Sequence, residues 1–157
     1  MHEIATVPTQ SINPVSTARI GTHPIHPMLV PFPIACFVGT LATDIAYWRT
    51  TEMMWADFSA WLLFAGLIMG GFAALAGLID FLSNRLIRGL PYAWFHMAGN
   101  AIVMLLALFN AFVHSRDAWT SVVPTGLVLS VLTVLIMLCT GWLGWAMVYR
   151  HRVGVAN

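Results

Sequence analysis

Four stretches of the chain are each apolar enough and long enough to cross a lipid bilayer. They cover residues 28–48, 58–82, 92–113 and 122–149. A helix needs about 20 apolar residues to cross the hydrocarbon core of a membrane. The connections between the stretches are short, which favours antiparallel neighbours. The sequence therefore predicts an all-α fold, an integral membrane four-helix bundle.

The composition agrees with a membrane protein and excludes several other classes. Only 8% of the 157 residues are charged and 59% are hydrophobic, whereas soluble domains carry about 25% charged residues. A net charge of +1 gives no nucleic-acid footprint. We expect one transmembrane domain over residues 23–155, after a polar and loosely ordered tail over residues 1–22. Cys36 and Cys139 lie inside apolar stretches and are interpreted as core residues, not as a disulfide.

The arginines are distributed unevenly between the two sides of the predicted bundle. Five of the seven fall on the side of the termini: Arg19, Arg85, Arg88, Arg150 and Arg152. Arg49 and Arg116 fall on the other side. Cytoplasmic loops carry an excess of positive charge. The pattern predicts that both termini are in the cytoplasm.

The second stretch carries small residues at helical spacing, namely Gly66, Gly70, Gly71, Ala74 and Gly77. Small side chains let helices approach each other closely in lipid. Packing within the chain is the favoured interpretation, and a dimer contact is the alternative. The first stretch begins with Pro27, Pro31 and Pro33, which predict an irregular start.

Polar residues gather at the predicted cytoplasmic boundary. His23 and His26 precede the first span, Asp80 closes the second, and His96 begins the third. His151 follows the fourth span, so every helix brings a titratable group to this level. Asn100 lies on the same helix face as His96, four residues further on.

Three interpretations of this cluster remain open. In the structural one, Asp80 pairs with Arg85, Arg88 or Arg150, and the histidines lie at the interface. In the second, neutral imidazoles from different helices bind a haem iron or another metal. His26 and His96 are then the expected ligands, and the haem is non-covalent because the chain has no CxxCH motif. In the third, the cluster passes protons or hydrogen-bonds a quinone head.

Two polar residues lie near the opposite boundary. Asp44 stands near the outer end of the first span and is predicted to reach the interface beside Arg49. His114 ends the third span beside Arg116 and Asp117, and is also predicted to be interfacial.

Several motifs resemble a bacterial membrane family known as domain of unknown function 2231. They are His23-Pro-Ile-His26-Pro-Met-Leu-Val-Pro-Phe-Pro-Ile, Gly77-Leu-Ile-Asp80, His96 and Gly141-Trp-Leu-Gly-Trp-Ala-Met-Val-Tyr149-Arg-His151-Arg-Val-Gly-Val155. The resemblance covers about residues 22–155. Some relatives join this domain to a Rieske iron–sulphur domain, which implies electron transfer in the membrane. Members often carry histidine where this chain has Pro31.

The functional expectation is an inner-membrane protein of a respiratory or redox setting. It binds haem b or contacts quinone at the cytoplasmic boundary, through His26, His96, His23, His151, Asp80 and Asn100. Its expected partners are the bilayer and a larger membrane redox complex. The alternative is a non-enzymatic membrane subunit without a cofactor. A standalone enzyme is not expected, because the chain shows no nucleophile–base pair, phosphate loop or zinc hydrolase motif.

Overall fold

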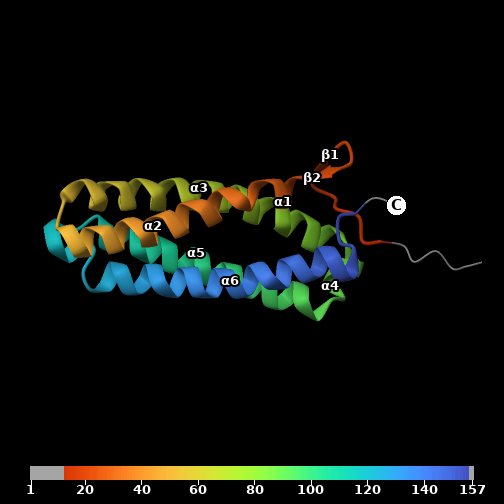
Figure 1. The fold of residues 1–157 in the computed structure, drawn as a ribbon. Coiled ribbons are helices and arrows are strands. Elements are labelled where there is room, and N and C mark those ends of the chain that lie inside the picture. The colour runs from red at the N-terminus through yellow and green to blue at the C-terminus, as the bar shows by residue number, and fades with distance from the viewer. Residues whose placement is uncertain (1–12, 156–157) are drawn as a thin grey trace, which may run out of the picture.

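The computed structural model describes residues 13–155, which form an elongated bundle of four long helices (Figure 1). The helices are α2 (Pro31–Thr50), α3 (Met53–Ser83), α5 (Pro91–His114) and α6 (Thr125–His151). Each is long and apolar enough to cross a membrane, the first as a continuous segment over Ile25–Thr50. The predicted all-α, four-helix class is confirmed.

Short elements mark the two ends of the bundle. At the end that holds both described termini, here called the terminal end, lie β1 (Arg19–Ile20), β2 (His23–Pro24), α1 (Ile25–Leu29) and α4 (Arg85–Arg88). The two strands pair antiparallel, with Ile20 opposite His23. The other end, here called the loop end, holds the α2–α3 connection and a 3-10 helix, η1 (Ala118–Ser121).

The first span begins irregularly, as its prolines predict. α1 ends at Leu29 and α2 begins at Pro31, while Val30 between them keeps helical dihedrals. Proline has no N–H to donate to the preceding turn. The Val30 amide still donates to the His26 carbonyl at 3.1 Å. The irregularity is therefore a local break in hydrogen bonding within one continuous membrane crossing.

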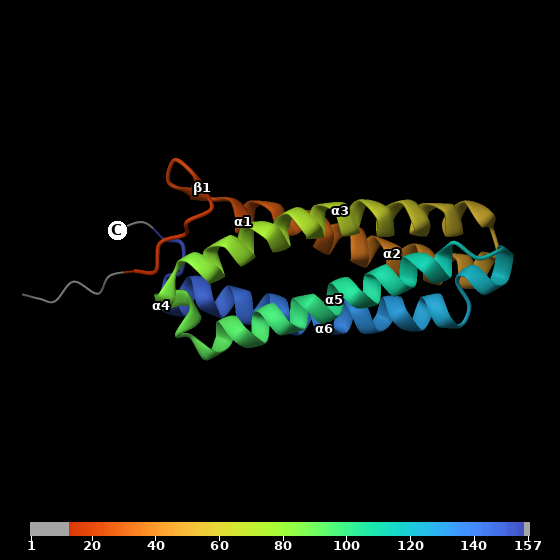
Figure 2. The same cartoon turned by 180° about the vertical axis from the view of Figure 1, so that it is seen from behind.

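The helices pack as two hairpins laid against each other. α2 runs along α3 and α5 runs along α6, while α2 and α5 lie diagonally across the bundle (Figures 1 and 2). The centre is filled by the apolar side chains of Phe37, Leu63, Val103, Ala107, Val134 and Met137. Many large apolar side chains point outward, among them Phe109 and Trp142. Such a surface suits lipid rather than water.

The glycines of α3 let neighbouring side chains approach its backbone. A Cβ added at Gly66 would lie 2.6 Å from the Phe37 ring, and one at Gly70 would lie 2.7 Å from the Met104 sulphur. A Cβ at Gly77 would lie 2.9 Å from Nδ1 of His26, whereas nothing lies within 4 Å of Gly71. Three of the four glycines thus serve packing within the chain, which confirms the favoured interpretation.

Candidate functional site

Two histidines meet at the terminal end of the bundle. His26 comes from α1 and His96 from α5, and their ring centroids lie 6.0 Å apart with the ring planes at 86°. Both are half-buried. The structure therefore brings together the two residues that the sequence favours as ligands, here called the imidazole pair.

Each imidazole is held by the backbone of a neighbouring helix. Nδ1 of His26 lies 2.7 Å from the carbonyl oxygen of Ala73 in α3, and Nδ1 of His96 lies 2.8 Å from that of Thr140 in α6. A carbonyl oxygen only accepts hydrogen bonds, so both Nδ1 atoms donate. In a neutral imidazole this leaves the lone pair on Nε2. Hydrogen bonds of this kind fix the tautomer and ring orientation of metal-ligating histidines.

The two Nε2 atoms differ in their surroundings. Asn100 donates from Nδ2 to Nε2 of His96 at 3.2 Å and accepts at Oδ1 from the Thr140 hydroxyl at 3.2 Å. Within residues 13–155, the only hydrogen bond found for the His26 ring is the one from Nδ1. The pair thus has one occupied and one free acceptor.

Glycines line the imidazole pair on two sides. The His26 ring lies against Gly77 of α3, and the His96 ring lies against Gly144 of α6, where a Cβ would be 2.9 Å from Cε1. A side chain at either position would push the ring aside. The close approach of the rings to both helices therefore depends on these glycines.

The geometry can be compared with a haem site. Two imidazoles that share one metal have ring centroids about 6 Å apart, because each metal–nitrogen bond is about 2.0 Å. The observed 6.0 Å matches that separation. A macrocycle between the rings requires that Asn100 release Nε2 of His96. Two imidazole Nε2 atoms are donors that could hold a haem iron, provided that the Asn100 hydrogen bond to His96 were released.

The remaining predicted site residues lie outside the imidazole pair. His23 is exposed on β2. His151 ends α6 and places its ring 5.5 Å from that of Tyr92. Both belong to the terminal end. Among residues 13–155, neither ring makes a ring contact or a hydrogen bond with His26 or His96.

Asp80 binds the N-terminal segment, so its predicted pairing with an arginine is wrong. Its carboxylate accepts from the Ser16 hydroxyl at 2.6 Å and from the amides of Thr17 and Ala18 at 2.6 and 2.7 Å. Among the described residues, the only ion pair lies at the other end of the bundle. Three short hydrogen bonds compensate the charge without a cation.

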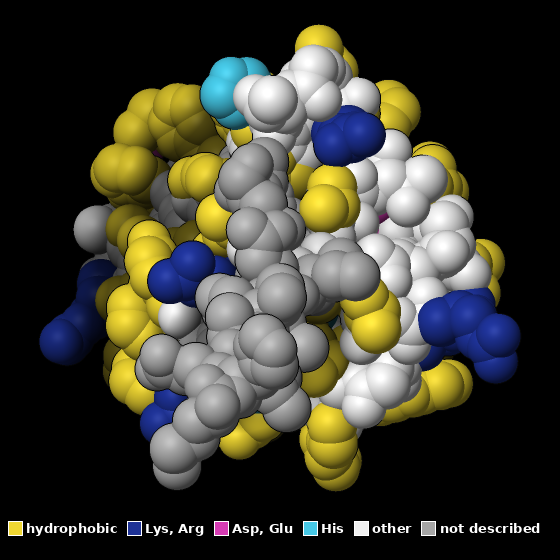
Figure 3. All heavy atoms as spheres, turned by 90° about the vertical axis from the view of Figure 1, so that its right-hand side faces the viewer, with side chains coloured by type: hydrophobic (Ala, Val, Ile, Leu, Met, Phe, Trp, Pro, Cys, Tyr) yellow, Lys and Arg dark blue, Asp and Glu magenta, His cyan; other side chains and the backbone are white. Residues whose placement is uncertain are grey.

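The part of the tail that precedes β1 is therefore docked. Besides the bonds to Asp80, the Val15 carbonyl accepts from Asn84 and the Pro14 carbonyl accepts from the Gly154 amide at 2.8 Å. The expectation of a loosely ordered tail is wrong for this segment, and residues 1–12 lie outside the described part. The arginines stand around the rim of this end, where Figure 3 shows them in dark blue.

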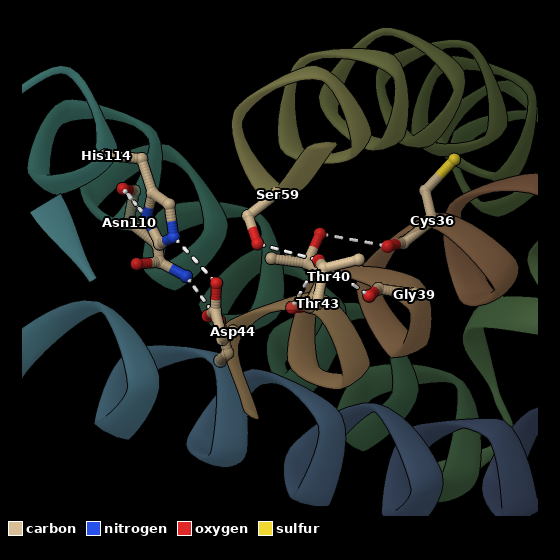
Figure 4. Close-up of polar contacts among 9 residues, drawn as sticks. Cys36, Gly39, Thr40, Thr43, Asp44, Ser59, Asn110 and His114 are labelled. Atoms are coloured by element: carbon tan, nitrogen blue, oxygen red, sulfur yellow. Dashed lines mark hydrogen bonds and ion pairs between the residues drawn. The ribbon is translucent and has the colours of Figure 1, made fainter. Parts of the chain in front are cut away.

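A second polar cluster lies at the loop end, and the sequence analysis did not find it. Asp44 is fully buried, and its Oδ1 lies 2.9 Å from Nε2 of His114. Its Oδ2 accepts from the Ser130 hydroxyl at 2.5 Å, and Ser130 accepts from Asn110 at 2.8 Å. Asp44 from α2 and His114 and Asn110 from α5 point toward one another in Figure 4. We call these four residues the loop-end network.

The loop-end network corrects two predictions. Asp44 does not reach the interface beside Arg49, which instead lies 5.3 Å from the ring centre of the adjacent Trp48. His114 is not interfacial, since only 1% of its side chain is exposed. A carboxylate buried inside the bundle needs a partner, and the buried imidazole of His114 supplies it.

The sequence did contain a signal for this network. Asp44 follows His26 by eighteen residues, and His114 follows His96 by the same interval. α5 also carries His96 and Asn100 at one end and Asn110 and His114 at the other, both four apart. Equal spacing on two helices that run in the same direction puts polar groups at two matching levels.

Comparison with known proteins identifies a family but no characterised relative. A family model described as "Predicted membrane protein (DUF2231)" matches residues 22–157. No curated protein and no solved structure matches the chain. The match covers nearly the whole bundle, including both polar clusters.

Proposed function

Because the chain belongs to the DUF2231 family of predicted membrane proteins, we propose that it is a redox subunit of the bacterial inner membrane that binds b-type haem. His26 and His96 would hold the haem iron through their Nε2 atoms. Asn100 and Thr140 position His96. Electrons come from and go to other members of a respiratory complex, with which the lipid-facing helices pack.

One observation carries the proposal, namely the geometry of the imidazole pair. The rings come from two diagonal helices, have centroids 6.0 Å apart, and each donates from Nδ1 to a backbone carbonyl of another helix. A low-spin b-type haem held by two histidines would take them through Nε2 atoms that come from different helices. Packing alone does not require both Nε2 atoms to remain unprotonated.

The test is the absorbance spectrum of the reduced protein, purified from cells supplied with haem. We expect a low-spin b-type spectrum that is lost in His26→Ala and in His96→Ala. His151→Ala, which removes a histidine of the same end whose ring lies against Tyr92, serves as the matched control and should keep it. A colourless wild-type protein would reject haem binding and favour a cofactor-free packing subunit.

A quinol is the second candidate ligand for the same site. Only Nε2 of His26 is free, so the pair has one acceptor ready for a donor such as a quinol hydroxyl. An apolar hollow of about 390 Å³ lies along α6 next to α2 and is lined by neither imidazole, but by Ile34, Met137, Leu138, Gly141, Trp142 and Trp145. Quinol binding to haem-free protein that is lost in His26→Ala but kept in His151→Ala would favour this candidate.

The proposed orientation puts both termini in the cytoplasm. Five exposed or half-exposed arginines surround the terminal end, whereas Arg49 and Arg116 are at the loop end. A reporter active only in the periplasm should be inactive after Asn157 and active when inserted near Glu52. The reverse pattern would place the imidazole pair at the periplasmic boundary.

A further inference from the structure

We propose that Asp44 and His114 form a proton-binding site inside the membrane, independent of the imidazole pair. The bound proton lies in the hydrogen bond between Nε2 of His114 and Oδ1 of Asp44, which are 2.9 Å apart. Both side chains are at least 99% buried. An ionisable residue within a membrane span is commonly functional, and its partner defines what it can do.

The proton content of the site follows from the surrounding hydrogen bonds. Nδ1 of His114 lies 3.0 Å from the backbone carbonyl oxygen of Asn110. A carbonyl oxygen only accepts hydrogen bonds, so Nδ1 carries a hydrogen. Ser130 accepts from the Asn110 amide and therefore gives its single hydrogen to Oδ2 of Asp44. These bonds leave only the contact between Nε2 and Oδ1 undetermined.

That contact requires one proton. If neither atom carried a hydrogen, the lone pair of Nε2 would face a negatively charged oxygen at hydrogen-bond distance. One proton, taken from water as H⁺, changes the charge of the two side chains from −1 to 0. The neutral unit avoids the cost of an unpaired charge inside the bundle.

The site is shielded from the other charged groups at the loop end. Arg49, Glu52, Asp57, Arg116 and Asp117 are all exposed. Tyr47 is buried nearby, but its hydroxyl donates to the Met53 sulphur at 3.7 Å. Asp44 and His114 therefore depend on each other for charge compensation.

Proton binding is coupled to helix packing in this arrangement. Asp44 belongs to α2 and His114 to α5, the diagonal helices. Loss of the proton leaves the carboxylate facing the imidazole lone pair, and relief requires that the imidazole change tautomer at the expense of its bond to Asn110, that the two helices separate or that water enter. The structure is thus the proton-loaded state of the site.

Solid-state NMR of ¹³C,¹⁵N-labelled protein tests the proposal, in vesicles of phosphatidylethanolamine and phosphatidylglycerol at neutral pH. We expect one proton more than an ionised Asp44 beside a neutral imidazole, seen either as His114 protonated on both nitrogens or as a protonated carboxyl carbon signal of Asp44. A His114 protonated on only one nitrogen together with an ionised Asp44 would overturn the proposal, whether or not any variant folds.

Asp44→Asn provides the matched variant. The introduced amide donates to Nε2 and accepts from Ser130, so the hydrogen bonds remain while the ionisable proton is lost. We expect the Nε2 signal of His114 to be of the unprotonated type in this variant. Asp57→Asn, which changes an exposed acid of α3, should leave the wild-type signals unchanged. A His114 that stays protonated on both nitrogens in Asp44→Asn would contradict the proposal.

Discussion

The two ends of the bundle hold comparable pairs of polar groups in different surroundings. At the terminal end, His26 and His96 are half-buried and one Nε2 has no partner among residues 13–155. At the loop end, Asp44 and His114 are fully enclosed and bonded to Ser130 and Asn110. Both pairs join the first span to α5. Eighteen residues of helix separate the two pairs, which corresponds to roughly 27 Å along the helix axis.

The residues that close the two ends of the bundle explain why one pair has a free acceptor and the other does not. The loop-end network lies beneath a small apolar cluster of Tyr47, Ala56 and Val122, with the Tyr47 ring 5.8 Å from that of Trp119. The terminal end is closed by a polar segment that Asp80 holds through hydrogen bonds. An apolar cover forces the enclosed charges to neutralise each other, whereas a polar cover tolerates a free acceptor that an external ligand can use.

The largest expected effect on stability concerns the pair of Asp44 and His114. Asp44→Leu leaves His114 and Ser130 buried without their acceptor, and should lower the free energy of unfolding by about 3–5 kcal/mol. Asp44→Asn keeps both hydrogen bonds and should cost about 1 kcal/mol. Unfolding in mixed detergent micelles measures both. Equal losses in the two variants would show that the hydrogen bonds at Asp44 contribute little.

Asp80→Ala should have the next largest effect, because it releases the cover of the terminal end. Loss of three hydrogen bonds to a charged group at the boundary should cost about 2 kcal/mol. Hydrogen exchange should become faster at the amides of Thr17 and Ala18, which Asp80 binds directly. Arg85→Gln, an exposed change in α4, serves as the control. Faster exchange in that control as well would restore a role for arginine in holding the segment.

Gly77→Ala should destabilise the protein by about 1–2 kcal/mol, because the added Cβ meets the His26 ring. Gly71→Ala adds the same atom one and a half turns away, where nothing lies within 4 Å, and should be neutral or slightly stabilising. Thermal denaturation in detergent compares the two. Equal melting temperatures would show that the His26 ring moves aside without cost.

The smallest effect is expected for His151→Ala. The ring contacts Tyr92 but is not described in contact with the imidazole pair, so the loss should be about 0.5 kcal/mol. The haem spectrum should be unchanged. Loss of the spectrum in this variant alone would move the proposed ligand from α1 to α6.

Much of the terminal end could be predicted from the sequence. His26 and His96 begin the first and third spans, so antiparallel packing with short loops must bring them to one level. Asn100 follows His96 by one helical turn, and its hydrogen bond follows from that spacing. The partner of Asp80 could not be predicted, because the docking of Ser16 depends on how a polar tail folds back over the bundle.

Hydropathy and span length by themselves determined the four crossings, since lipid accepts only long apolar helices. They also determined which residues share a level. The rotation of each helix about its axis was decided by tertiary packing, which turned Asp44 toward His114 instead of toward Arg49. A single apolar helix in lipid can rotate about its axis with little change in free energy, because most of its faces are apolar. Only the fit of side chains against glycines and the need to pair buried charges select which face turns inward.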